Sequence, residues 1–267
     1  MRADRFRKKV LDHWRRHGRH NLPWRTNMTP YRVLVSEYML QQTQVPRVIG
    51  KFRTFLRMFP TFRKLAFAKP VTVLAAWQGL GYNRRALLLR RCAQIVVRQH
   101  RGSLPRDPKV LQGFPGIGPY TAAAIAVFAY DVPHPLIETN VRRVYLHHFF
   151  PGRRNVPDAA IAPLVARDVR AAPSARVWFS ALMDYGTWLA SQIINPNRQS
   201  RHYARQSPFQ GSVRQLRGQV VRLLLQGPRT NIQIASAFGD DQRLANVLAG
   251  LQREGFVVHT KNRYRCA

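Results

Sequence analysis

Hydrophobic residues recur at three- to four-residue spacing through most of the first 190 positions, and this pattern predicts a series of amphipathic helices. In residues 3–16, Phe6, Val10, Leu11 and Trp14 share one helical face, while arginines and lysines occupy the other. Further helices are predicted in residues 30–59 (a helix, a turn and a helix), residues 70–100 (two helices around the turn WQGLGYNRR), from Pro119 onward, and in residues 158–171 and 174–190. The chain is therefore expected to be all-α over this part.

The pattern changes after residue 190. Residues 191–212 have little hydrophobic periodicity and many basic and small polar residues, so we interpret them as a linker or surface loop. Residues 213–267 predict three short helices and a β-hairpin that turns near Lys261 and Asn262. This order is typical of a winged helix, which meets duplex DNA or a protein partner through its third helix and wing. We expect three parts, with boundaries at 1–190, 191–212 and 213–267.

The stretch LQGFPGIGPYTAAAIAVFAYDVPHPLIETNVRRV holds a device for binding phosphate. Phe114–Gly118 predicts a hairpin between two helices, in which Gly116 and Gly118 permit positive φ or close approach, and Pro119 suits the first turn of the next helix. The first N–H groups of that helix lack intrahelical acceptors and lie at the positive end of its dipole, so a DNA phosphate is a natural ligand. A turn that only joins two helices is the alternative.

Net charge changes this picture further. The 267 residues contain 44 lysines and arginines against 12 aspartates and glutamates, which gives a net charge of +32 and a pI near 11.7. The basic residues are spread through the predicted helices and do not flank a lipid-facing stripe, so double-stranded DNA is the expected partner. A basic surface without such a partner is the alternative.

The distribution of apolar residues argues against a membrane-spanning protein and against a secreted one. The chain has no apolar run of about 18 residues, and its basic N-terminus has no hydrophobic signal segment, so we expect a cytoplasmic protein near the nucleoid, with no membrane. Its two cysteines, Cys92 and Cys266, are too few for a four-thiolate iron–sulfur cluster or zinc site. We expect no cofactor of that kind.

Against so basic a background the few carboxylates become candidates for chemistry. Glu37 and Glu138 are two of the three glutamates in the chain. Glu37 lies in a predicted helix ahead of a polar run, where exposure to solvent is the simpler interpretation. Glu138 precedes Thr139 and Asn140 at a helix start, where capping is the simpler interpretation.

Five motifs in one order resemble those of the helix-hairpin-helix DNA glycosylase superfamily. They are PWR at Pro23, SEYMLQQTQV from Ser36, GLGYNRR from Gly79, FPGIGPYTAAAI from Phe114 and ETNVRRV from Glu138. The resemblance covers residues 5–190 and is greatest for the MutY-type adenine glycosylases. It implies a two-lobed all-α fold that holds DNA across a cleft, with the target base flipped out into it.

The resemblance also implies roles for the candidate residues. Glu37 stands where the family's glutamate protonates the departing adenine and then helps to activate water, and Glu138 stands where an aspartate stabilises the positively charged sugar. Apolar surroundings are expected to keep Glu37 protonated, and basic surroundings to keep Glu138 ionised. Asn140 is expected to position the water or the sugar. Tyr120 occupies the place of the lysine of strand-cutting relatives, so a monofunctional glycosylase without a covalent adduct is expected.

The expected DNA contacts come from the same resemblance. Gln42 and Tyr82 are expected to intercalate beside the lesion, and the backbone of Gly116 and Gly118 to hold a phosphate, with a possible monovalent cation at this hairpin. The other expected contacts to DNA are Gln41, Thr43, Arg84, Arg85, Thr121, Arg142, Arg198 and Arg201.

Three features depart from the family pattern. Glu138 is one methylene longer than the family's aspartate. The four cysteines that ligate an iron–sulfur cluster in most relatives are missing after Gly186, where Arg198 and Arg201 are expected to replace the cluster's contacts to the DNA backbone. The hydrolase-like C-terminal domain of adenine glycosylases is replaced by the expected winged helix.

The sequence thus predicts a monomeric, monofunctional DNA glycosylase of base excision repair, with adenine opposite guanine or oxidised guanine as the expected substrate. A thymine or uracil mismatch glycosylase of the same superfamily is the alternative enzyme. A catalytically silent DNA-damage-binding protein is the alternative from another class. The hypothesis of a transcription factor built on the winged helix accounts for residues 213–267 but not for the first 190 residues.

Overall fold

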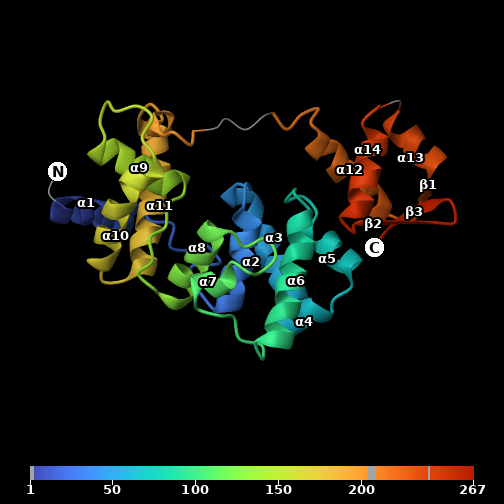
Figure 1. Ribbon diagram of the computed structural model, residues 1–267, viewed down its shortest axis with the longest axis horizontal. Helices are drawn as coiled ribbons and strands as arrows, with labels where there is room; N and C mark the ends of the chain where they lie inside the picture. Colours follow the sequence, from blue (N-terminus) through green and yellow to red (C-terminus); the bar gives the residue numbers. More distant parts are fainter. Residues whose placement is uncertain (1–2, 204–207, 240) are drawn as a thin grey trace. The chain divides into compact units, whose positions relative to one another are not determined.

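The computed structural model describes residues 3–203, 208–239 and 241–267, and the chain forms two compact units (Figure 1). One unit comprises Met1–Glu37 and Pro105–Arg205, and the other comprises Tyr38–Leu104 and Gln206–Ala267. Each unit therefore combines two stretches that are distant in sequence. The predicted predominantly helical architecture is confirmed.

The first unit is helical. Its elements are α1 (Ala3–His17), most of α2 (Pro30–Leu40), α7 (Pro108–Leu111), α8 (Pro119–Tyr130), α9 (Thr139–Phe149), α10 (Asp158–Arg170), α11 (Ala175–Gln192) and the 3-10 turn η1 (Pro196–Gln199). None of the described helices of the protein combines the length and the apolar character that crossing a lipid bilayer requires.

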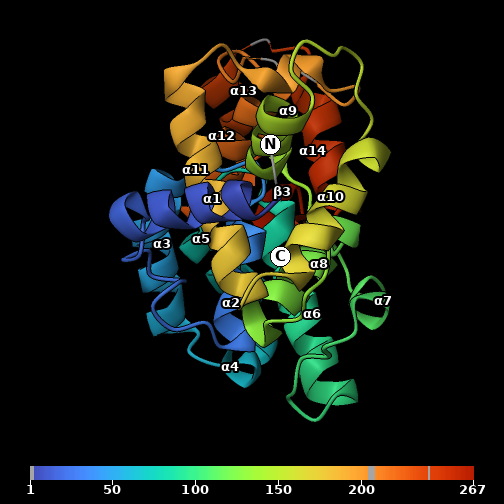
Figure 2. The same cartoon turned by 90° about the vertical axis from the view of Figure 1, so that its left-hand side faces the viewer.

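The core of the first unit forms where α1 and α9 pack against α11 (Figures 1 and 2). Phe6 of α1 makes edge-to-face contacts with Tyr145 of α9 and Trp178 of α11, with ring centroids 5.4 and 5.8 Å apart. All three side chains are fully buried. Aromatic contacts of this kind add to the stabilisation from burial and fix α9, whose first turn carries part of the candidate site.

Asp184 of α11 ties down the proline-broken segment that follows α1. Its carboxylate accepts hydrogen bonds from the backbone N–H of Arg19 at 2.8 Å and from the Arg25 guanidinium at 2.6 Å. Arg25 is the arginine of the PWR motif, and both its side chain and that of Asp184 are buried. The motif therefore serves the fold of this unit.

The second unit begins with a set of helices: α3 (Val45–Met58), α4 (Phe62–Phe67), α5 (Pro70–Trp77) and α6 (Arg84–Gln99). Helix α6 packs along α4 and α5. The two helices predicted around the turn WQGLGYNRR are present as α5 and α6. The six-residue α4 was not predicted, because so short a helix shows no hydrophobic period of its own.

Residues from Val213 onward form a small group of three helices and a sheet. Its elements are α12 (Val213–Leu225), β1 (Arg229–Thr230), α13 (Asn231–Phe238), α14 (Leu244–Arg253), β2 (Val257–Thr260) and β3 (Arg263–Cys266). The antiparallel sheet has the order β1-β3-β2. Lys261 and Asn262 have φ of 47° and 62°, as the tight turn between two twisted strands requires. The predicted helices and hairpin are present, and two-residue β1 is an addition.

The segment after α11 is more ordered than the predicted linker. Val156 donates its N–H to the carbonyl of Gln199 at 2.8 Å, and Arg201 donates its N–H to the carbonyl of Val156 at 3.0 Å. The Asn197 side chain donates to the carbonyl of Thr139 at 3.1 Å. Residues 193–203 are thus attached to the start of α9 and to Val156 ahead of α10, while residues 204–207 of the predicted linker lie outside the described part of the chain.

Candidate active site

The turn Phe114–Gly118 leads from α7 into α8 as predicted. Gly116 has φ of 81°, in the left-handed region that favours glycine. Gly118 is the N-cap of α8 with an extended backbone, and a Cβ atom there would meet no heavy atom within 4 Å. Gly116 therefore makes the turn, and Gly118 leaves open space in front of the first N–H groups of α8, where an anion can approach.

Glu138 caps α9 with its own carboxylate. Its Oε1 atom accepts the N–H groups of Asn140 and Val141 at 2.7 and 2.8 Å, and its Oε2 atom accepts the Asn140 side-chain amide at 3.2 Å. Burial raises the pKa of Glu138, while these two backbone N–H groups and the guanidinium of Arg143 act in the opposite direction. The basic surroundings expected from the sequence are present, but burial outweighs them.

Glu37 lies inside the unit and not on a polar face. It is 9% exposed, at the C-terminal end of the α2 segment that belongs to the first unit. Burial, with a smaller contribution from the charge of Glu138, raises its pKa to about 8. A carboxyl group with this pKa carries a proton at neutral pH, so Glu37 is available as an acid.

Tyr120 completes a cluster with the two glutamates. Burial raises the pKa of its phenol, and the charges of Glu37 and Glu138 add to the effect, although the residue as a whole is 36% exposed. These mutual effects place the three side chains, which come from α2, α8 and the start of α9, within electrostatic reach of one another. The structure therefore brings together the residues that the sequence singled out for catalysis.

Arg143 and Gly186, which the sequence did not predict as site residues, fix the position of Asn140. Its Oδ1 atom accepts a hydrogen bond from Arg143 at 2.6 Å, and the same Arg143 nitrogen donates to the carbonyl of Gly186 at 2.8 Å. A Cβ atom at Gly186 would lie 2.5 Å from the carbonyl oxygen of Asn140, so only glycine allows α11 to approach α9 here. The i, i+3 spacing of Asn140 and Arg143 was an available signal; Gly186 had none.

Arg85, expected at the DNA surface, is buried in the second unit. It is 6% exposed, and its guanidinium donates to the carbonyls of Gln41 at 2.7 Å and Gly81 at 2.9 Å and to the Thr43 hydroxyl at 3.0 Å. Burial lowers the pKa of Arg85 to about 10. Arg85 thus joins the turn after α2 to the turn after α5, and its donors are occupied by protein oxygens.

The two turns that Arg85 joins present the residues expected to intercalate. Gln42 and Tyr82 are exposed, and each has a positive φ, of 53° and 46°, which is uncommon for residues other than glycine. Strained backbone of this kind concentrates at functional sites. Arg84 is also exposed beside Tyr82, and Gln41 and Thr43 are half-buried.

The remaining predicted contacts divide into two kinds. Thr121 is buried in α8, and Arg142 forms a two-pronged ion pair with Asp158 through distances of 2.7 and 2.7 Å, so both residues serve first to build the unit. Arg198 and Arg201 are exposed on the segment around η1. These two arginines have the accessibility that a phosphate contact requires.

Comparison with known proteins agrees with this arrangement. Residues 35–164, which contain Glu37, the hairpin and Glu138, match the model of the HhH-GPD superfamily base excision DNA repair proteins. These residues form an HhH-GPD domain. The two cysteines of the chain, Cys92 and Cys266, lie buried in α6 and β3.

The relatives that the chain matches include DNA glycosylases. The chain is 43% identical over 157 residues to the adenine DNA glycosylase of Mycolicibacterium smegmatis, a match that covers 58% of this chain and 51% of the relative. It is 36% identical over 141 residues to the thymine/uracil-DNA glycosylase of Pyrobaculum aerophilum, covering 52% of this chain and 61% of the relative. The chain thus spans about half the length of the adenine glycosylases that it matches.

Solved structures share the fold of the HhH-GPD domain. A thermostable thymine-DNA glycosylase matches with a TM-score of 0.60 at 23% identity, covering 69% of this chain and 85% of that chain. Endonuclease III in a non-covalent complex with DNA matches with a TM-score of 0.55 at 16% identity, covering 78% of this chain and 91% of that chain. At these identities the likeness concerns the fold alone.

Proposed function

We propose that the protein is a DNA glycosylase that hydrolyses the N-glycosidic bond of a flipped-out base in double-stranded DNA, with adenine opposite guanine or oxidised guanine as the substrate. The observation that carries the proposal is the pair of unlike carboxyl groups: Glu37 is buried with a pKa near 8, whereas Glu138 receives two backbone N–H groups at a helix start. An acid and an anion side by side are what cleavage of a glycosidic bond requires.

In the proposed reaction Glu37 donates its proton to a ring nitrogen of the base while the bond from that base to the sugar breaks. The electron pair of the bond leaves with the base, and the sugar becomes an oxocarbenium-like cation. Glu138, in its ionised form, stabilises this cation. Water then adds to the sugar carbon, and its proton passes to the Glu37 carboxylate, which restores the starting acid and leaves an abasic site.

Asn140 and Tyr120 have positioning roles in this proposal. Asn140 donates its amide to Glu138 and is itself fixed by Arg143, so it holds the anion in one orientation. Tyr120 has a phenol where Schiff-base chemistry needs an amine, so the strand is left uncut and no covalent adduct forms. The proposed enzyme is therefore monofunctional.

DNA binding rests on three features. The first N–H groups of α8 and the open space at Gly118 would accept a phosphate, and the hairpin carbonyls would be the oxygen ligands of a monovalent cation there. Gln42 and Tyr82 would enter the base stack. Arg198 and Arg201 would contact the backbone from a segment that hydrogen bonds to Thr139 and Val156 hold in place, without an iron–sulfur cluster.

The group of α12 to β3 is proposed to be a winged helix, because its element order and its antiparallel hairpin follow that plan. Lys261, Arg263 and Arg265 are exposed along the hairpin. This charge favours a duplex over a neutral protein surface, and we assign the hairpin to the DNA backbone.

The deciding experiment is single-turnover base release on labelled duplexes that carry adenine, thymine or uracil opposite guanine, and adenine opposite oxidised guanine. Strand breaks that appear only after alkali, with no product trapped by borohydride, would agree with monofunctional chemistry. The Glu37→Gln variant should bind the duplex normally and release base at least about 100-fold more slowly. Release by this variant at the normal rate would exclude Glu37 as the acid.

A thymine or uracil mismatch glycosylase is the second candidate function. The chain is 36% identical to a relative from Pyrobaculum aerophilum that is named thymine/uracil-DNA glycosylase. Release from thymine or uracil opposite guanine, and not from adenine, would favour it. Binding to all of the duplexes without release from any would instead favour a damage-binding protein.

A further inference from the structure

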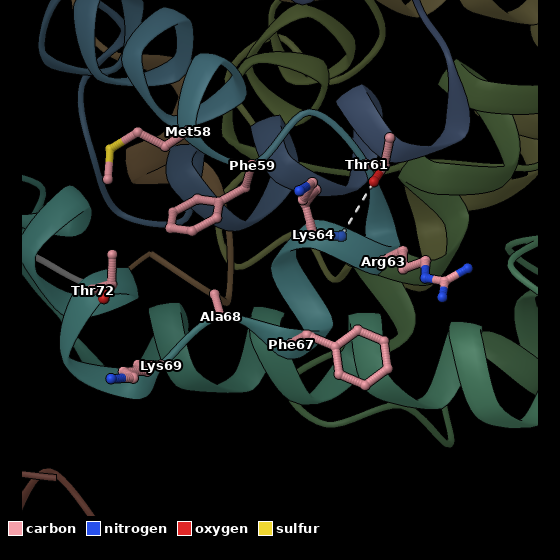
Figure 3. Close-up of a pocket in the computed structure, with 9 residues that line it drawn as sticks. All are labelled: Met58, Phe59, Thr61, Arg63, Lys64, Phe67, Ala68, Lys69 and Thr72. Carbon is pink, nitrogen blue, oxygen red and sulfur yellow. Dashed lines mark hydrogen bonds between the residues drawn. The ribbon is translucent and has the colours of Figure 1, made fainter.

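A hollow in the second unit has no part in the proposed reaction. It has a volume of about 540 Å³ and lies where the C-terminal end of α3, the whole of α4 and the start of α5 meet (Figure 3). Met58 and Phe59 come from the end of α3, and Lys69 and Thr72 from the start of α5. The hollow is thus formed by local packing within one unit.

The hollow lies at the opposite ends of α3 and α5 from the turns that carry Gln42 and Tyr82. The first turn precedes α3, whereas the hollow lies at the other end of this helix, about 20 Å away at 1.5 Å per residue. The second turn follows α5, whereas the hollow lies at the start of α5. The hollow is therefore separate from the two turns that are proposed to enter the base stack.

Four of the residues that line the hollow present apolar carbon, and two of these side chains are exposed. Phe67 is 67% exposed and Met58 is 44% exposed, while Phe59 and Ala68 supply further carbon surface. Large exposed apolar side chains gathered at one concave surface mark an interaction site more often than scattered ones do. A volume of about 540 Å³ has room for more than one apolar side chain of a partner.

The rim of the hollow is cationic. Arg63, Lys64 and Lys69 line it and are exposed. From residue 38 to residue 104 every charged side chain is a lysine or an arginine, so no carboxylate of this stretch balances the rim. The rim therefore attracts acidic groups, and the interior attracts apolar ones.

We propose that this hollow docks an acidic peptide segment of a partner protein, which places an apolar side chain against Phe67 and Met58 and its carboxylates on Lys64, Lys69 and Arg63. A DNA duplex offers the negative charge but no apolar group that projects far enough to fill a pocket. A segment with alternating or flanking carboxylates around a leucine or phenylalanine offers both. The proposal is independent of the glycosylase function.

The test uses Met58 as a reporter. The chain has five methionines, so protein labelled with 13C at the methionine methyl groups gives few NMR signals, and a Met58→Leu variant assigns the one of interest. The probe is a short peptide with a central leucine–phenylalanine pair between runs of aspartate and glutamate. We expect it to shift the Met58 signal, to leave that of Met183 unchanged, and to bind with a Kd on the order of 10 μM.

Two variants and one control locate the binding. Phe67→Ala and Lys64→Glu should each weaken binding of the probe about tenfold. Arg91→Glu changes the charge by the same amount as Lys64→Glu at an exposed position of α6 outside the hollow, and it should change the Kd less than twofold. Because Phe67 and Lys64 are exposed, these variants should fold, which circular dichroism would check.

Several results would overturn the proposal. These are an unshifted Met58 signal, equal affinity for a companion peptide with serine in place of its acids, and displacement of the peptide by a bound duplex. A single-stranded oligonucleotide that shifts Met58 and depends on Phe67 would overturn it as well, because the hollow would then be a base-stacking site.

Discussion

Two glutamates at the candidate site lie in unlike surroundings. Burial makes both carboxyl groups costly to ionise, but Glu138 also accepts hydrogen bonds from the first turn of α9, which oppose this effect. The proposed chemistry depends on that contrast, and so does part of the stability of the folded protein.

Stability should therefore depend on Glu37 in a pH-dependent way. Its folded-state pKa of about 8 exceeds the ordinary value of 4.5, so the folded protein retains a proton that the unfolded chain releases. The resulting penalty is absent below pH 4.5 and grows as pH rises toward 8. Glu37→Gln should raise the free energy of unfolding by about 2–4 kcal/mol at pH 7.5 and leave it unchanged near pH 4.5. Urea titrations at both pH values measure this, and an equal effect at both would refute the shift.

Glu138 permits a second test, because a shorter carboxylate still caps a helix. Aspartate is among the preferred N-cap residues, so Glu138→Asp should change the free energy of unfolding by less than about 1 kcal/mol while it moves the charge by roughly 1 Å. Glu138→Gln keeps the length and removes the charge, and it should slow single-turnover base release by about 100-fold or more. If glutamine supported the same rate as glutamate, the anion would have no role.

At the scale of elements, the close approach of α11 to α9 sets the position of Asn140. The contact depends on Gly186, and Arg143 bridges the two helices by bonding both the Asn140 side chain and the Gly186 carbonyl. In the proposed reaction, the orientation of Asn140 beside the sugar would thus depend on the spacing of these two helices.

Gly186→Ala should separate these helices. The added Cβ atom would meet the Asn140 carbonyl oxygen at 2.5 Å, so the backbone must shift, and we expect a loss of about 2–3 kcal/mol in the free energy of unfolding together with slower base release. Gly50→Ala in α3 is the matched control, because a Cβ atom there meets nothing within 4 Å and alanine favours helix by about 1 kcal/mol. Thermal unfolding of the two variants should shift in opposite directions, and a stabilised Gly186→Ala would contradict the contact.

Local patterns predicted most helices, the hairpin at Gly116 and the final β-hairpin, because these depend on spacing and turn chemistry within short stretches. Glu37 and Glu138 were singled out as rare carboxylates in a basic chain, and the resemblance to helix-hairpin-helix glycosylases added Tyr120 and Asn140. The sequence did not predict the burial of Arg85, whose acceptors lie on turns more than forty positions before it as well as next to it. Contacts between distant segments leave no periodic signal in the sequence. Residues that make such contacts, such as Arg85 and Gly186, were therefore not predicted to have a structural role.

For the whole molecule the net charge of +32 should dominate DNA affinity. The logarithm of the binding constant should fall linearly with the logarithm of salt concentration, with a slope of about −0.9 for each phosphate neutralised. Lys261→Ala with Arg263→Ala should make this slope shallower by about 2 and leave single-turnover release unchanged. The double variant Arg222→Ala, Arg253→Ala removes the same charge from exposed helical positions and should alter the slope less. Fluorescence anisotropy across a salt series measures both, and equal slopes for the two variants would show that the hairpin does not touch DNA.

The run from residue 38 to residue 104, with its unopposed basic side chains, also has a consequence for titration. Burial raises the pKa of Cys92 to about 12 and also raises that of Tyr38, so neither group becomes an anion at neutral pH. The stretch also has no carboxylate, and its basic side chains therefore face no negative charge from within it. The bend that we expect in a pH–rate profile near pH 8 would thus report the deprotonation of Glu37 in the first unit.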